Sequence, residues 1–346
     1  KKNPLGGLSR KYVKIKEMRD AGIDPLILDA GDLFFSTKNI DATNKNSEIF
    51  RANAIMEGFQ KVGCDAINVG HYETLNGLSF LREMVKKTDI PFISSNLKDS
   101  KSGQLLFDPY IIFERGELKI GVIGATDLVP DTMKSVQSDD FIESCNRYAK
   151  ELENKVDIIV ALVNASRSSQ NGLPEKMPDI DFIVTSGNTS MSRTNSPQKE
   201  NGPFMYSCGK QGKYFLTLTL DIKEKGVPFV DISAEEKKVK SVQKRFEKLQ
   251  KKDPEKNLEE IYADQENVLN LIKKYREDLK NSEEVIASAI NTLKFQTNPL
   301  NNKVGDDEDI LAFVTSSVKT CDSLAPKKKP VARNKNKNNR HAGHDH

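Results

Sequence analysis

Seven short runs rich in isoleucine, valine and leucine alternate with helical patterns between residues 22 and 222. They read LILDA, DAINV, IPFISS, LKIGVIGA, DIIVALV, DFIVTS and YFLTLTLDI. Strands that are apolar along their whole length, rather than at every second residue, are typical of a sheet covered on both faces. The pattern therefore predicts an α/β fold with helices outside the sheet and any ligand-bearing loops at the carboxyl ends of the strands.

A change of composition marks the end of this pattern. Four apolar side chains recur at helical spacing in the charged segment that follows, namely Val239, Val242, Phe246 and Leu249. A second such stripe covers residues 258–279, after a break at Pro254. These features predict a helical hairpin that opens a C-terminal helical segment, residues 233–320. Two further short helices are expected near residues 283–295 and 307–319.

The apolar stripe of this hairpin has two interpretations. Its charges are mixed in sign and lie mostly on the other faces, as on a solvated surface. The simpler interpretation is that the stripe packs on the sheet domain, because it is too short for a long coiled coil. The alternative is a surface for a protein partner over residues 235–280.

The end of the chain is polar and basic. Its last twenty residues read KKKPVARNKNKNNRHAGHDH and include three of the four histidines, at positions 341, 344 and 346. We expect residues 321–346 to form a disordered tail, since such a composition cannot bury a core. A flexible run of histidine and aspartate binds transition metals only weakly.

The overall composition excludes several classes of protein. The 53 basic and 50 acidic residues nearly balance, which predicts no specific binding of nucleic acid. No apolar run reaches the about 18 residues of a membrane helix, so no membrane span is expected. No G-x-S-x-G elbow, P-loop or G-x-G-x-x-G loop is present. The four cysteines are widely spaced, which argues against structural zinc or covalent haem and favours free thiols, with a disulfide as the alternative.

One segment carries a motif with unusual residues. Residues 64–77 read CDAINVGHYETLNG. The segment resembles a loop of the calcineurin-like metallophosphoesterases, most closely of their 5′-nucleotidase branch, which reads roughly D-A-x-x-x-G-N-H-E-F-D-x-G. Five residues fall in register with that loop, namely Asp65, Ala66, Gly70, Glu73 and Gly77.

Further segments resemble the same branch in the same order. They are NPLGGLSRKYVKIK (3–16), PLILDAGDLFF (25–35), IPFISSNL (90–97), KIGVIGAT (119–126), DIIVALVNAS (157–166) and DFIVTSGNTS (181–190). An ordered set of blocks is far more specific than any one of them. The resemblance implies a metallophosphoesterase-like two-sheet α/β sandwich flanked by helices for residues 1–232, followed by the helical segment.

The resemblance also assigns the family's metal site to particular residues. Its metal positions correspond to Asp32, His71, Glu73, Asn164, Asn188 and Ser190. The family's ligating asparagine is replaced by His71, and its catalytic histidine by Tyr72. Its three later ligand histidines are replaced by Asn164, Asn188 and Ser190. A tyrosine, with a usual pKa of about 10, is a weaker acid than an imidazolium ion.

These replacements bear directly on activity. A binuclear phosphoesterase clamps its substrate between two metal ions, and imidazole binds manganese, zinc or iron better than an amide or a hydroxyl does. We therefore expect one divalent metal ion or none. The first hypothesis is a divergent 5′-nucleotidase-like homologue with reduced or lost phosphoester hydrolysis. The alternatives are an active phosphatase or nucleotidase with a rebuilt site, whose substrate is a phosphate ester or nucleotide, and a non-catalytic binding module that acts through its helical segment.

The beginning of the chain differs from that of the family. The sequence starts at Lys1 and opens on a helix, whereas the family opens on a strand with a D-x-H ligand motif. We expect processing or truncation to have removed that strand together with any export signal. Because the branch is mostly exported, the expected location is periplasmic or extracellular.

Overall fold

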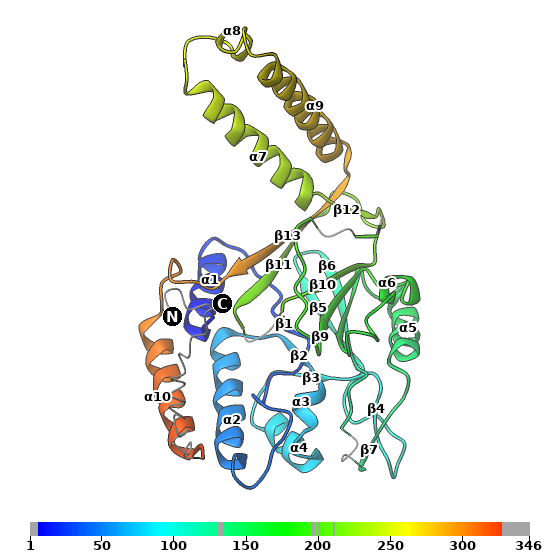
Figure 1. Cartoon of the computed structure of the whole chain (residues 1–346). Helices are drawn as coiled ribbons and strands as arrows, with labels where there is room; N and C mark the ends of the chain where they lie inside the picture. Colours follow the sequence, from blue (N-terminus) through cyan, green and yellow to red (C-terminus); the bar gives the residue numbers. More distant parts are fainter. Residues whose placement is uncertain (1–5, 131–133, 196–197, 200, 210–211, 327–346) are drawn as a thin grey trace, which may run out of the picture.

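The computed structural model of the chain describes residues 6–130, 134–195, 198–199, 201–209 and 212–326. One layer of its body is a five-stranded sheet in the order β10-β9-β8-β6-β5 (Figure 1). The strands are β10 (Phe204–Ser207), β9 (Phe182–Ser186), β8 (Ile158–Asn164), β6 (Leu118–Thr126) and β5 (Tyr110–Arg115). The first four are parallel, and β5 pairs with β6 in the antiparallel sense.

The second layer contains two smaller sheets. The parallel sheet β1-β2-β3 consists of β1 (Leu28–Asp29), β2 (Ala66–Asn68) and β3 (Phe92–Ile93). The sheet β11-β13-β12 consists of β11 (Tyr214–Asp221), β13 (Asn291–Pro299) and β12 (Phe229–Asp231). A separate ribbon pairs β4 (Leu97–Asp99) with β7 (Val136–Ser138).

A hydrophobic core joins the two layers. It combines Val122 and Leu162 of the large sheet with Ile93 and Leu293 of the smaller ones. The ring of Tyr206 stacks on that of Phe295, with centroids 4.5 Å apart. All seven residues of β8 are buried, as expected for a strand that is covered on both faces. The predicted two-sheet α/β sandwich is confirmed.

Helices cover the outer faces. Beside β1, β2 and β3 lie α2 (Lys45–Val62), α3 (His71–Thr74) and α4 (Leu78–Lys86), while α5 (Phe141–Leu152) and α6 (Leu173–Lys176) cover the five-stranded sheet. Two helices from the ends of the chain, α1 (Leu8–Asp20) and α10 (Glu308–Leu324), pack together beside α2. No helix in the described part of the chain is long and apolar enough to cross a membrane.

The helical hairpin forms an arm that projects from the body beyond β12 and β13 (Figure 1). It consists of α7 (Ser233–Gln250), the short α8 (Leu258–Ile261) and α9 (Glu266–Ser288). Val242 and Ile272 are buried between the long helices, and the ring of Phe246 meets that of Tyr275 edge-on at 6.1 Å. The interpretation that the apolar stripe packs on the sheet domain is therefore wrong, because α7 and α9 bury their apolar sides against each other.

The remaining predictions for the C-terminal region differ in outcome. The short helix expected near residues 283–295 is wrong, since α9 ends at Ser288 and β13 begins at Asn291. The helix expected at 307–319 is confirmed by α10, which continues to Leu324 and so occupies the start of the predicted tail. Residues 327–346, with the three C-terminal histidines, lie outside the described residues. All four cysteines are free thiols.

Candidate functional site

The candidate site residues lie at the carboxyl ends of parallel strands. Asp32 follows β1, and His71, Tyr72 and Glu73 form the short helix α3 directly after β2. Asn164 is the last residue of β8 and is paired in register with Ser186, the last residue of β9. This edge of the sandwich is where an α/β sheet exposes strand-end loops to a ligand.

Glu73 joins two of these loops. Its side chain is fully buried. Oε2 accepts hydrogen bonds from the backbone N–H groups of Asp32 and Gly70, both at 2.9 Å. Oε1 accepts from Leu33 at 2.7 Å and from Phe34 at 3.3 Å. Four donors occupy both carboxylate oxygens, so Glu73 connects the loop after β1 to the loop after β2.

The charge of this buried group is disfavoured. Burial, followed by the negative charge of Asp32, raises the pKa of Glu73 to about 7, against the lowering effect of the backbone donors. Asp32 itself has a left-handed backbone with φ of 70°, which is uncommon for a residue other than glycine. Its Oδ1 accepts a hydrogen bond from the backbone N–H of Tyr72 at 3.1 Å.

Asn164 joins a third and a fourth segment to this cluster. Its Oδ1 accepts from the backbone N–H of His71 at 3.0 Å and from the hydroxyl of Thr126 at 3.2 Å. Its Nδ2 donates to the hydroxyl of Ser186 at 2.7 Å, which in turn donates to the backbone carbonyl of Ala30 at 2.6 Å. The amide side chain therefore ties the ends of β1, β6, β8 and β9 to α3.

The approach of Gly70 to this network is very close. A Cβ atom on Gly70 would lie 2.9 Å from Cγ of Asn164 and 2.9 Å from the backbone nitrogen of Asp32. Any side chain there would displace the amide or the loop. Gly70 is thus required for the close packing of the two loops around Asn164.

Two further asparagines that the sequence did not single out hold neighbouring strand ends. Nδ2 of Asn68 donates to the carbonyls of Ala30 and Ala125, at 3.1 and 3.0 Å. Asn96 donates to the carbonyl of Thr126 at 2.7 Å and accepts from its N–H at 3.1 Å. The available signal was an asparagine at or directly after the end of three apolar runs: Asn68 is the next-to-last residue of DAINV, Asn96 follows IPFISS, and Asn164 follows DIIVALV.

Asn188 and Ser190 stand apart from this network, and His71 and Tyr72 join it through their backbone N–H groups. Oδ1 of Asn188 accepts from the backbone N–H of Ser190 at 2.6 Å, which closes a local turn, and the side chain of Ser190 is exposed. Within the described residues, Nδ2 of Asn188 and Nδ1 of His71 are buried without a hydrogen-bond partner. Burial and the charge of Asp32 raise the pKa of Tyr72 above its usual value, so it is a weaker acid still.

The side chains present do not fit a two-metal centre. Among the described residues no group of three or more His, Cys, Asp or Glu side chains is placed to hold a metal ion. Glu73 and Asn164 direct their oxygens to groups of the protein itself. Apart from Glu73, whose carboxylate is occupied by backbone donors, Asp32 and His71 are the predicted ligands that combine a strong donor type with a position in the cluster.

Comparisons with known proteins agree with this fold. No protein-family model matches the chain. Over 249 residues the chain is 26% identical to a snake venom 5′-nucleotidase of Gloydius brevicauda, an alignment that covers 64% of the chain and 41% of the relative. The chain spans less than half of the length of the first curated relatives it matches.

Solved structures show the same architecture. A 5′-nucleotidase precursor from Thermus thermophilus superposes with a TM-score of 0.63 at 17% identity, over 93% of this chain and 54% of the other. The calcineurin-like phosphoesterase YfkN of Bacillus subtilis gives a TM-score of 0.61 at 18% identity, over 92% of this chain and 90% of the other. With the ordered motifs, the sequence relatives support a 5′-nucleotidase-like metallophosphoesterase, and the solved structures show that its fold is that of the calcineurin-like phosphoesterases.

Proposed function

We propose that this chain is a divergent 5′-nucleotidase-like homologue that has lost phosphoester hydrolysis. The observation that carries the proposal is that the side-chain oxygens of Glu73 and Asn164 accept hydrogen bonds from the protein itself. Both stand at metal positions of the family, and both direct their oxygens to backbone and hydroxyl groups of the surrounding loops. Hydrogen bonds here hold the loops together at the place where the family would use metal ions.

The chemistry of hydrolysis gives the reason for lost activity. A pair of metal ions activates water and neutralises the charge that develops on the phosphate. Asp32 and His71 would hold one ion at most, with Asn188 and Ser190 directed to a local turn. Tyr72, with its raised pKa, would be a poor proton donor to the leaving alcohol at neutral pH.

Metal analysis paired with an activity assay tests this proposal. The protein is purified with manganese or zinc, and its metal content is measured by mass spectrometry. Hydrolysis of nitrophenyl phosphate and nucleoside monophosphates is measured on the same samples. We expect one equivalent of metal or less, with hydrolysis close to background. Two tightly bound equivalents with ordinary turnover would show that the substituted residues form a working site.

A second candidate is an active phosphatase with a rebuilt single-metal site. It is favoured by the unpartnered Nδ1 of His71, which lies in the cluster that contains Asp32. In that case His71→Gln should abolish both metal binding and hydrolysis of phosphate esters. If His71→Gln leaves a measurable hydrolytic rate unchanged, this candidate is excluded.

The arm supports a role in binding a protein partner through residues 235–280. The arm projects away from the sheets (Figure 1). Its two long helices expose many charged side chains, and Leu271 on α9 is 41% exposed. A photo-reactive residue at the exposed position of Lys244 should give a discrete crosslinked product in the source cells. The same residue at Lys86, an exposed lysine of α4, is the matched control. Equal crosslinking at the two positions would contradict this role.

Export of the protein is also part of the proposal. It is supported by the similarity to a protein named for its presence in snake venom. Fractionation of the source cells, with an antibody against the arm, should recover the protein outside the cytoplasm. Recovery with cytoplasmic markers would refute export.

A further inference from the structure

Helix α10 has an inner side that is fully used in packing. Ile310 and Cys321 are buried on this side. The ring of Phe313 lies close to Gly58 of α2, where a Cβ atom would be 3.6 Å from its Cε1. These contacts fix α10 against α2 at the margin of the body, on the side opposite the arm (Figure 1).

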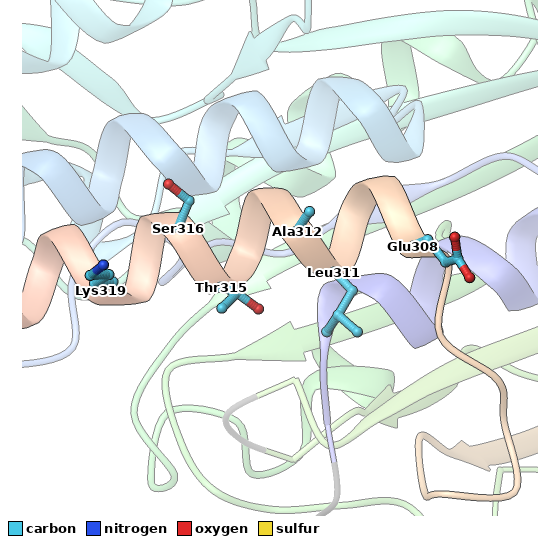
Figure 2. A pocket seen from close by; sticks show the side chains of 6 residues that line it. All are labelled: Glu308, Leu311, Ala312, Thr315, Ser316 and Lys319. Carbon is cyan, nitrogen blue, oxygen red and sulfur yellow. The ribbon is translucent and has the colours of Figure 1, made fainter.

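The outer side of α10 carries an unpartnered stripe. An open groove of about 580 Å³ lies over it and is lined by Glu308, Leu311, Ala312, Thr315, Ser316 and Lys319 (Figure 2). Leu311 is 43% exposed, and Val318 beside the stripe is 52% exposed. Because large apolar side chains with this much exposure often mark a contact surface, Leu311 and Val318 are candidates for burial against another surface.

The stripe has a charge at each end and small side chains between them. Glu308 lies in the first turn of α10, and Lys319 lies eleven residues later on the same side. Within the described residues neither of them forms an ion pair. Ala312, Thr315 and Ser316 occupy the middle, where small side chains permit close approach of a second helix.

We propose that this stripe pairs with the same stripe of a second copy of the chain, with the two α10 helices antiparallel about a twofold axis. An isologous interface must be self-complementary. The axis would pass between residues 313 and 314, so that Glu308 lies opposite Lys319 of the second copy and Ala312 opposite its Thr315. Leu311 would lie opposite Ser316. Each dimer gains two Glu–Lys pairs, and the antiparallel helix dipoles are also favourably arranged.

The size of the contact sets its expected strength. A helix of 17 residues is about 25 Å long, so one helix pair buries less than a standard interface of about 1,600 Å². We therefore expect a weak dimer with a dissociation constant of about 10–100 µM. A segment of a longer chain, or a different protein on the same stripe, would instead leave this chain monomeric.

Sedimentation equilibrium of the full chain from about 5 to 500 µM tests the pairing. Lys319→Glu and Glu308→Lys each turn two attractive pairs into repulsive ones and should weaken the dimer about tenfold or more. The double variant Glu308→Lys/Lys319→Glu restores both pairs in reverse and should return the dissociation constant to near its original value. Ala312→Arg places a long side chain at the centre and should give a monomer.

Two controls keep the result interpretable. Lys86→Glu reverses an exposed lysine of α4 and should leave association unchanged. Circular dichroism of every variant should match the unmodified protein, since each change lies on the exposed side of a helix. A monomer throughout the concentration range, a dimer insensitive to Ala312→Arg, or a double variant no tighter than the single reversals would each overturn the pairing.

Discussion

Replacing Asn164 by alanine should destabilise the protein far more than loss of one polar side chain at the surface. The substitution removes three hydrogen bonds, from His71 N–H, from the Thr126 hydroxyl and to the Ser186 hydroxyl. Each is worth about 1 kcal/mol, and a donor left without an acceptor costs about 1–3 kcal/mol more. We expect the free energy of unfolding to fall by about 3–5 kcal/mol, a large part of a typical total of about 5–15 kcal/mol.

Urea unfolding followed by circular dichroism measures this loss. Each protein is unfolded once in chelator and once with added zinc or manganese. The control is Asn154→Ala, at an exposed position after α5, which should change the free energy by less than about 0.5 kcal/mol. A loss below about 1 kcal/mol for Asn164→Ala would refute the structural role of the network. A loss that occurs only with metal present would make Asn164 a ligand instead.

Three further predictions address the neighbouring residues and the arm. The fold raises the pKa of Glu73 from 4.5 to about 7, so the folded state favours the protonated side chain. The contribution of Glu73 to the free energy of unfolding is therefore fully present below pH 4.5 and is lost as pH rises through 7. Urea unfolding from about pH 4.5 to 8 should show the unmodified protein losing about 3 kcal/mol relative to Glu73→Gln, and parallel pH profiles would contradict this. Gly70→Ala should cost about 1–3 kcal/mol by urea unfolding, whereas Gly305→Ala, with open space around it, should cost little; equal effects would refute the crowding argument. Phe246→Ala should speed hydrogen exchange in α7 and α9 without changing exchange in β8, and an equal increase in β8 would contradict an independent arm.

The part of the fold that the sequence predicted rests on local patterns. The buried run of β8 and the motif glycine at position 70 are visible within a few residues of sequence, as is the position of Asp32 after its strand. The role of Asn68 was not predictable in this way. Its partners, the carbonyls of Ala30 and Ala125, are 38 and 57 residues away.

The mistaken helix at residues 283–295 has a different cause. Apolar residues recur at helical spacing along α9, and the prediction extended this helical pattern beyond Ser288, where α9 ends. In β13 the buried residues are Asn291, Leu293 and Phe295, which alternate with less buried ones at the period of a strand. That alternation was present in the sequence. The arm projects because the apolar side of α7 packs on α9 and not on the sheet domain. The spacing of apolar residues along α7 does not distinguish these two surfaces.

The replacement of imidazole by amide at Asn164 predicts that the family's residues cannot be restored one at a time. An amide offers an oxygen that accepts from His71 and Thr126 and a nitrogen that donates to Ser186. A neutral imidazole has one acceptor and one donor on a larger ring, and Gly70 already lies in close contact with this side chain. Asn164→His should therefore lose about as much stability as Asn164→Ala, and zinc titration calorimetry should detect no new tight site, because Glu73 still directs its oxygens to the loop backbone. Stability regained on adding zinc to Asn164→His would show instead that the loops retain the geometry of a metal site and lack one ligand.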